Sequence, residues 1–243
     1  LAWIRKIERN PQVKGVLLRV DSPGGGAAAS QEVYDALARL AQKRPLAVSM
    51  GSMAASGGLM VSMAGGRIFA NPSTVTGSIG VRMDIPQLQG LLGKIGVGQE
   101  TLVTAPYKNA GSYLHPLSPE DRAYFEGVLK DMHEQFVDIV AKGRDMPRER
   151  AGQLASGKIF TGREALKLGL VDEMGGQDAA LRWLAERTGV PAERKLLTKP
   201  KESSWLADSL KSWFGLDLSA LATVSGLNAS GSDWRTPVFL YQF

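Results

Sequence analysis

The segment from Leu46 to Gly66 constrains the fold of this chain more than any other, because it contains no charged residue. Its sequence, LAVSMGSMAASGGLMVSMAGG, has the length of a membrane span, which needs about 20 predominantly apolar residues. However, it holds five glycines and four serines, and polar residues are costly inside a bilayer. We therefore expect a buried strand, a turn and a buried helix here, rather than a span.

Ser56 occupies the predicted turn. The apolar run Leu46–Met50 favours a strand before it, and Gly57–Met63 favours a buried helix after it. A serine at such a turn has an exposed hydroxyl and a free backbone N–H, which are the parts that acyl transfer needs. The segment departs from the G-x-S-x-G elbow of α/β-hydrolases because Ala54 replaces the first glycine. A packing turn without catalysis is the alternative interpretation.

The elements around this segment alternate between strand and helix. Val13–Val20 is an apolar run typical of a buried strand, Ser30–Lys43 has helical spacing, and Arg67–Ala70 predicts another short strand. Such alternation predicts an α/β domain. The length of 243 residues allows one large domain or two small ones.

Further along the chain, capping residues and apolar periodicity predict more elements. Ser118 is the expected N-cap of the clearest helix, with Asp121 as its capping partner. The predicted elements are a short helix and then a strand, ETLVT, within Leu91–Thr104; a helix over Pro119–Lys142; a helix that starts at Thr161–Glu164 and ends near Gly169; and a helix over Asp178–Arg187.

The composition changes near Thr198, where lysine, serine, tryptophan and glycine become dominant. We therefore predict a main domain over residues 1–197 and a tail or assembly segment over residues 198–243. The final PVFLYQF favours a β-strand, which could add to a neighbouring molecule. A last strand of the same domain is the alternative.

A serine nucleophile needs a base, and the sequence offers three candidates. The chain has two histidines, His115 in a loop and His133 within a predicted helix. Lys108 lies in an uncharged loop of small residues. A lysine base must be neutral, so its pKa must fall from about 10.4, which burial can achieve. A solvated loop lysine remains the alternative for Lys108.

The segment Asp21–Gly26, DSPGGG, follows a buried strand and precedes a helix. Free glycine N–H groups at such a turn can stabilise a developing oxyanion, and the same geometry can bind phosphate. The following residues do not complete a G-x-G-x-x-G pattern, which argues against a dinucleotide site.

Composition excludes several other classes of function. The net charge is +5 with scattered basic residues, so we expect no nucleic-acid partner. The absence of cysteine excludes disulfides and thiolate metal sites. No H-E-x-x-H motif or calcium loop occurs, so we expect no metal and no cofactor.

Several motifs occur together in a particular order: DSPGGG, GSMAASGG, TGSIGV and the lysine of APYKNAGSYLHPLSPEDR. This combination resembles the signal peptide peptidase A family of bacterial Ser-Lys serine proteases. The resemblance extends from about Gly15 to Gly176 and includes SGKIFTGREALKLGLVDEMGG. It implies an α/β fold of the ClpP/crotonase type, built from repeated β-β-α units.

The resemblance also implies a role for individual residues. Ser56 matches the nucleophile and Lys108 matches the general base. Ser78 matches the serine that positions the lysine amine, and Gly25 and Gly57 match the glycines whose N–H groups form the oxyanion hole.

Members of the family degrade remnant signal peptides, and they form homo-oligomers at the bacterial cytoplasmic membrane with the protease domain on the extracytoplasmic side. For this chain the resemblance implies peptide substrates, assembly into a homo-oligomer, and an N-terminal membrane anchor that would precede Leu1. Ser56 and Lys108 could come from one chain or from two. Apolar substrates predict apolar pockets, for which Met53, Met60, Ile79 and Val81 are candidates. The alternatives are a crotonase-like enzyme without protease activity and a non-catalytic oligomeric scaffold of the same fold.

Overall fold

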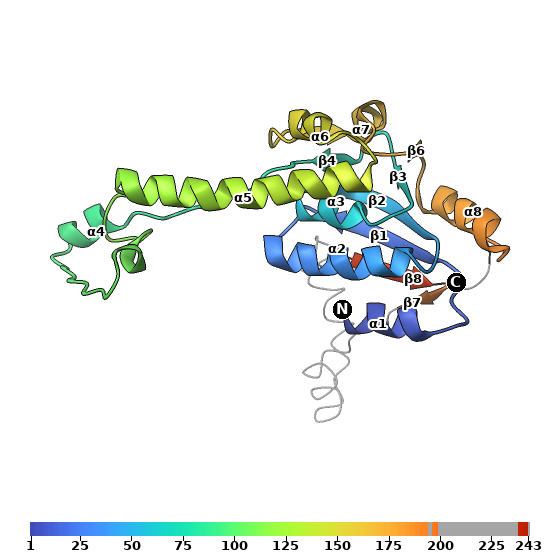
Figure 1. Cartoon of the computed structure of the whole chain (residues 1–243), viewed down its shortest axis with the longest axis horizontal. Coiled ribbons are helices and arrows are strands. Elements are labelled where there is room, and N and C mark those ends of the chain that lie inside the picture. The colour runs from blue at the N-terminus through green and yellow to red at the C-terminus, as the bar shows by residue number, and fades with distance from the viewer. Residues whose placement is uncertain (194–195, 199–237, 243) are drawn as a thin grey trace, which may run out of the picture. The chain divides into compact units, whose positions relative to one another are not determined.

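The computed structural model describes residues 1–193, 196–198 and 238–242. These residues form two units. Unit 1 combines Leu1–Ser78 with the chain from Ile159 onward, and unit 2 is Ile79–Lys158. Figure 1 labels most of the helices and strands of both units.

A mixed β-sheet organises unit 1. Its strands within the described residues run in the order β5-β4-β2-β1-β8-β7, and β3 pairs with both β2 and β6. The pairs β1–β2, β2–β3, β2–β4 and β3–β6 are parallel, whereas β4–β5, β1–β8 and β7–β8 are antiparallel. The strands are β1 (Val16–Ser22), β2 (Leu46–Ala55), β3 (Arg67–Ala70), β4 (Val75–Gly77), β5 (Ile159–Thr161), β6 (Glu173–Met174), β7 (Leu197–Thr198) and β8 (Val238–Gln242).

Helices cover both faces of the central strands (Figure 1). Leu17 of β1 packs in one buried cluster with Leu184 of α8 (Gln177–Thr188). Val20, which points to the opposite face because side chains alternate along a strand, lies next to Gly58 of α3 (Gly57–Ser62). Burial on both faces explains the apolar runs Val16–Leu18 of β1 and Leu46–Val48 of β2.

Three helices of unit 1 agree closely with their sequence signals. α2 (Ala27–Ala41) and α8 occupy the predicted helical segments. α7 (Gly162–Leu168) begins with a complete capping box and ends at Gly169 in the left-handed conformation, as expected for a helix C-terminus. The sequence analysis missed α1 (Ala2–Arg9). The predicted α/β class is confirmed.

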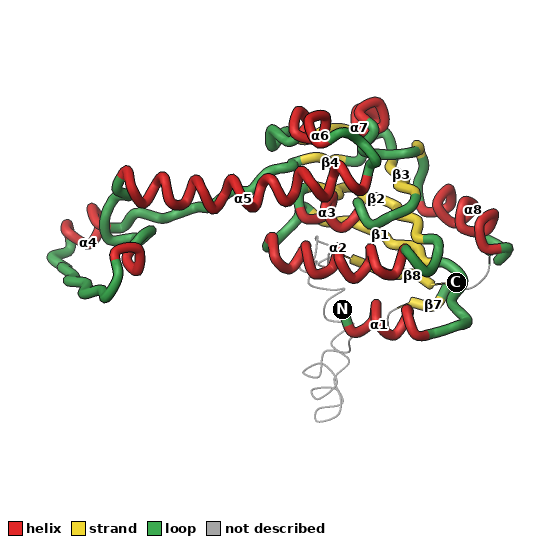
Figure 2. Tube along the Cα trace, viewed as in Figure 1, coloured by secondary structure: helices red, strands yellow, loops and turns green. Residues whose placement is uncertain are grey.

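Unit 2 contains α4 (Gln89–Lys94), the short 3₁₀ helix η1 (Pro106–Asn109), α5 (Pro119–Gly143) and α6 (Arg148–Leu154). Ser118 caps α5 as predicted, since its hydroxyl accepts a hydrogen bond from the Asp121 N–H at 3.0 Å. The predicted strand at residues 100–104 is wrong. Figure 2 draws this segment as loop, and its Leu102 is 89% exposed, so it has no buried face to stabilise a strand.

The uncharged segment Leu46–Gly66 forms β2 and α3, as expected from its glycine and serine content. No helix among the described residues combines the length and the apolar character needed to cross a membrane. Within the predicted tail, β8 pairs with β1 of the same chain. Residues 199–237 and 243 lie outside the described residues, and the proposed role of the tail falls largely on them.

Candidate active site

Ser56 lies between β2 and α3 in a strained backbone conformation, with φ 51° and ψ −120°. Its N–H donates to the carbonyl of Gly77 at 2.9 Å, so the expectation of a free backbone N–H at this serine is wrong. Its own carbonyl accepts from the Met60 N–H at 2.9 Å. The side chain is half-buried. A non-glycine residue held at such angles costs about 1–3 kcal/mol, and residues of this kind concentrate at functional sites. The turn therefore presents Ser56 as a nucleophile elbow does.

Gly24 packs directly against this turn. Its φ is 111°, and a Cβ added to it would lie 2.7 Å from Ser56 Cβ and 2.8 Å from Gly57 N. Both observations require glycine at position 24, because an L-residue rarely adopts this φ and a side chain would collide with Ser56. The DSPGGG loop is thus placed against Ser56.

The two glycines predicted to form the oxyanion hole lie on adjoining backbone segments. A Cβ added to Gly57 would lie 3.2 Å from Gly25 N. Within the described part of the chain, neither the Gly25 N–H nor the Gly57 N–H donates a hydrogen bond. No heavy atom comes within 4 Å of a Cβ position built on Gly25. Two free donors beside Ser56 are what stabilisation of an oxyanion requires.

Ser22 fixes the start of the glycine loop. Its side chain is only 3% exposed, and its hydroxyl accepts a hydrogen bond from Gly24 N–H at 3.1 Å. At the other end of the loop, the Ser30 hydroxyl donates to the carbonyl of Gly26 at 3.0 Å. The loop that carries Gly25 is therefore held by side chains at both ends.

Ser78 is positioned beside Ser56 by strand pairing. Ala55 of β2 is in register with Gly77 of β4 in a parallel pair, so Ser56 and Ser78 each follow directly after paired residues. Ser78 also has a positive φ of 53°. Parallel neighbouring strands end at the same edge of the sheet, and this brings the two serines together.

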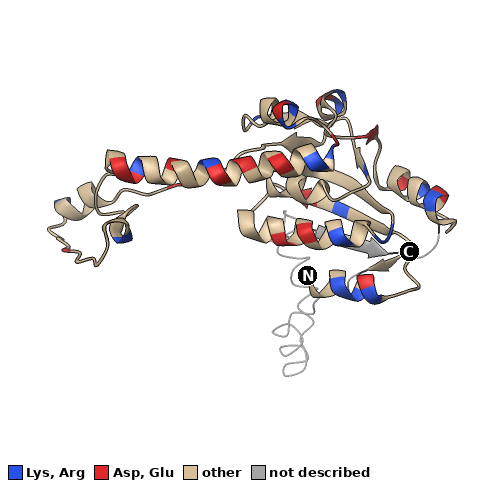
Figure 3. Ribbon diagram, viewed as in Figure 1, with Lys and Arg blue, Asp and Glu red and all other residues tan. Residues whose placement is uncertain are grey.

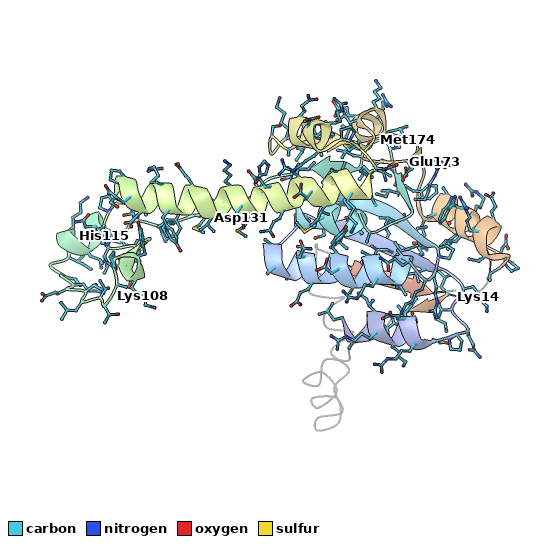
Figure 4. The ribbon with its side chains drawn as sticks, in the orientation of Figure 1. Lys14, Lys108, His115, Asp131, Glu173 and Met174 are labelled. Carbon is cyan, nitrogen blue, oxygen red and sulfur yellow. The ribbon has the colours of Figure 1, made fainter. Side chains whose placement is uncertain are left out.

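Lys108 belongs to unit 2, on η1, and is exposed. Figure 4 shows it near His115 in the part of unit 2 that holds α4. The structure groups Ser56, Ser78, Gly25 and Gly57 in unit 1 and does not place Lys108 among them.

The two histidines make hydrogen bonds within unit 2. His115 Nδ1 is 3.1 Å from the carbonyl oxygen of Pro116, and its Nε2 is 2.8 Å from Asn109 Nδ2. His133 Nε2 donates to the carbonyl of Ala155 at 2.9 Å. Both rings therefore have local structural partners, and neither shares a unit with Ser56.

Two of the candidate substrate-pocket residues, Ile79 and Val81, line a cavity of about 460 Å³ in unit 2. Leu129 and His133 of α5 form another wall of this cavity. Met60, a third candidate, is 6% exposed and belongs to the core. No group of three or more His, Asp or Glu side chains in the described ranges is arranged to hold a metal ion.

Sequence reasoning treated DSPGGG as a source of N–H groups and missed what its other members do. Asp21, Ser22 and Gly24 each make a contact that shapes the site. The signal was available in the motif, since a short polar side chain next to glycine often hydrogen-bonds to a nearby backbone group.

Comparison with known proteins identifies a peptidase family and several related proteases. The sequence model of peptidase family S49 matches residues 38–191. A putative protease of Synechocystis is 40% identical over 74% of this chain and 65% of its own length. A putative protease of Methanocaldococcus jannaschii is 38% identical over 76% of this chain, which spans 59% of that relative. A putative signal peptide peptidase SppA of Enterococcus faecium is 34% identical over 99% of this chain and 72% of its own length.

Proposed function

Because the chain belongs to peptidase family S49, we propose that it is a serine endopeptidase in which Ser56 is the nucleophile and Lys108 is the general base. The resemblance to the signal peptide peptidase A family is confirmed by the same comparisons, as is the ClpP/crotonase-like fold. Family membership also favours a peptidase over the crotonase-like and scaffold alternatives.

One observation carries this proposal. Ser56 is held at a strained turn with the free N–H groups of Gly25 and Gly57 on adjoining backbone. A serine that only stabilised a turn would need neither the strain nor two unused donors. Loss of one oxyanion donor typically raises the barrier by about 2.7–4 kcal/mol.

The proposed reaction has two steps. In the first, the neutral amine of Lys108 takes the Ser56 hydroxyl proton while Oγ attacks the peptide carbonyl, and the Gly25 and Gly57 N–H groups stabilise the oxyanion. The resulting ammonium gives its proton to the leaving amine, and an acyl-enzyme remains. In the second, Lys108 takes a proton from water as the water oxygen attacks the acyl group. The ammonium then returns this proton to Ser56 Oγ as the ester bond breaks and the new carboxyl terminus leaves. The Ser78 hydroxyl holds the lysine amine in place.

This mechanism needs a Lys108 side chain that is shielded from water. Association with a second copy of the chain would provide that shielding. Eleven of the fourteen large hydrophobic residues exposed in the described chain lie between Met83 and Val128. Only five charged residues occur over residues 79–118, and Figure 3 shows few charges around α4. We call residues 83–128 the apolar segment of unit 2. An exposed apolar surface of this kind marks an interaction site. The proposed enzyme is therefore a homo-oligomer in which a second copy covers the apolar segment and buries Lys108.

The proposed substrates are apolar peptides, including the remnants of cleaved signal peptides. Support comes from the apolar side chains of Ile79, Val81 and Leu129 in the cavity of unit 2, and from the relative named as a putative signal peptide peptidase. The expected location is the extracytoplasmic side of the bacterial membrane.

The test is cleavage of an apolar peptide by wild type, Ser56→Ala and Lys108→Ala. Each variant is expected to lose roughly 10³-fold or more in kcat, as is typical for members of a nucleophile–base pair. Lys142→Ala, which changes an exposed lysine of unit 2 outside both the apolar segment and the cavity, is the matched control and should keep wild-type turnover. If Ser56→Ala and Lys108→Ala both turn over at the wild-type rate, the dyad is wrong.

The pH dependence of kcat/KM provides a second readout for the base. Activity should rise as the pH rises, because only the neutral amine accepts a proton. A profile that follows an imidazole and disappears in His115→Ala would assign the base to histidine instead.

A further inference from the structure

The strand that leads to Ser56 contains an irregularity. β1 and β2 pair in register from Val16 to Val20, where Val20 lies opposite Met50, but Ser22 lies opposite Ala54. The two residues from Val20 to Ser22 along β1 therefore span the same distance as the four residues from Met50 to Ala54 along β2. The extra residues form a bulge at Gly51–Met53, immediately before the turn that holds Ser56. Bulges of this kind often re-aim a side chain next to an active site.

Asp21 fills the gap that the bulge opens on the β1 side. Its Oδ1 accepts a hydrogen bond from the Met53 N–H at 3.0 Å. A Cβ added to Gly51 would lie 2.6 Å from Asp21 Cγ, so the carboxylate packs directly over the Gly51 Cα. The side chain thus replaces the strand partner that the bulged residues lack.

On the β4 side, two buried threonines hold the same part of β2. Thr74 Oγ1 donates to the carbonyl of Gly51 at 2.8 Å, and Thr76 Oγ1 donates to the carbonyl of Ala54 at 2.6 Å. The bulge is therefore held from both sides, by Asp21 of β1 and by Thr74 directly before β4, and Thr76 holds the residue that follows it.

We propose that Asp21 is a positioning residue for the oxyanion hole. Its main chain leads into Ser22 and the loop that carries Gly25, and its side chain holds the strand that leads into Ser56 and Gly57. One residue therefore connects the two backbone segments that supply the oxyanion donors. The inference rests on the proposed peptidase function, and it assigns Asp21 a role through hydrogen-bond acceptance rather than through charge.

The test compares Asp21→Ala with Asp21→Asn, which retains a carbonyl oxygen at the same position. Asp21→Ala should lower kcat roughly 10- to 100-fold with little change in KM, since small displacements of catalytic groups have effects of this size. Asp21→Asn should recover most of the wild-type kcat. Asp21→Ser, whose hydroxyl is too short to reach Met53, is a second disruptive variant should Asp21→Ala fold poorly.

Asp172 provides a matched control in the same sheet, because its Oδ2 accepts a hydrogen bond from the Ile68 N–H of β3 at 2.7 Å. Asp172→Ala should lower the Tm and leave kcat unchanged. Equal kcat for wild type and Asp21→Ala, with Ser56→Ala inactive, would overturn the role of Asp21 and leave the peptidase intact. An Asp21→Asn variant as impaired as Asp21→Ala would also overturn it.

Hydrogen exchange tests the inference without relying on activity. Backbone amides of residues 51–56 should exchange faster in Asp21→Ala than in wild type and Asp21→Asn, and Asp172→Ala should leave them unchanged. Unaltered exchange in Asp21→Ala would show that the carboxylate does not hold the bulge. If Ser56→Ala cleaves peptide as fast as wild type, the proposed function fails, whereas the exchange result still decides the role of Asp21.

Discussion

Single residues in unusual backbone conformations build the candidate site. Ser56 and Ser78 have φ values of 51° and 53°, and Gly24 has a φ of 111°. Each angle is maintained by its surroundings, since strand pairing fixes both serines and the Ser22 hydroxyl holds the Gly24 N–H. Strain that recurs at adjacent positions is typical of a functional site.

Replacement of Gly24 should therefore abolish activity. In Gly24→Ala the new methyl group would meet Ser56 Cβ and Gly57 N, and the residue would have to keep a positive φ. We expect kcat to fall by at least roughly 10²-fold, because the nucleophile or the oxyanion donor must move. Peptide-cleavage kinetics measure this loss.

Gly26→Ala is the matched control for Gly24→Ala. No heavy atom lies within 4 Å of a Cβ built on Gly26, and its φ is negative. This variant should retain near wild-type kcat. A Gly24→Ala enzyme as active as Gly26→Ala would contradict the close packing of the loop against Ser56.

At the scale of elements, the short α7 shows how local sequence specifies a boundary. The Thr161 hydroxyl accepts from the Glu164 N–H at 3.2 Å, and Glu164 Oε2 accepts from the Thr161 N–H at 2.9 Å. These hydrogen bonds from the Thr161 backbone and side chain lower the pKa of Glu164 below its usual value of 4.5. The capping box fixes where β5 ends and α7 begins.

The stabilisation from Glu164 should depend on pH. Because its folded-state pKa is lowered, the contribution is fully present above the unfolded-state pKa and is lost as pH falls through the folded-state pKa. Glu164→Ala should therefore have a lower Tm than wild type at pH 7, and the difference should shrink below about pH 4.5. Thermal unfolding across this range measures it. A Tm difference that is constant with pH would mean that the carboxylate charge contributes nothing.

At the scale of the whole molecule, the candidate catalytic groups are divided between two units. Ser56, Ser78 and the oxyanion glycines lie in unit 1, whereas Lys108 and most of the exposed apolar side chains lie in unit 2. Since a lysine base must be desolvated to be neutral at moderate pH, and Lys108 is exposed, the proposed mechanism places it in the site of a neighbouring copy.

This arrangement predicts complementation between two inactive variants. Mixing Ser56→Ala with Lys108→Ala should restore peptide cleavage, because Ser56 of one variant then meets Lys108 of the other. Peptide turnover after mixing and reassembly is the measurement. Ser56→Ala mixed with the double variant is the control and should stay inactive. If the first mixture forms mixed oligomers but does not cleave peptide, Ser56 and Lys108 of the same chain must act together.

Much of the fold was predictable because it depends on neighbours in sequence. Capping residues and apolar periodicity located α5, α7 and α8, and the buried apolar runs located β1 and β3. The strand predicted at residues 100–104 is wrong because its apolar residues have no buried partner, which no local pattern reveals. The roles of Ser78 and Lys108 came from family resemblance, and both remain predictions.

The sequence by itself determined that an uncharged strand, turn and helix would present Ser56, and that glycine N–H groups would follow Asp21. Only the tertiary structure decided how these parts meet. β2 continues past Met50 to Ala55 through residues with little intrinsic strand preference, because Asp21, Thr74 and Thr76 supply its hydrogen bonds. Ser78 reaches Ser56 because β4 pairs with β2. Pairing between strands distant in sequence depends on burial and on partner groups, and local sequence does not encode these.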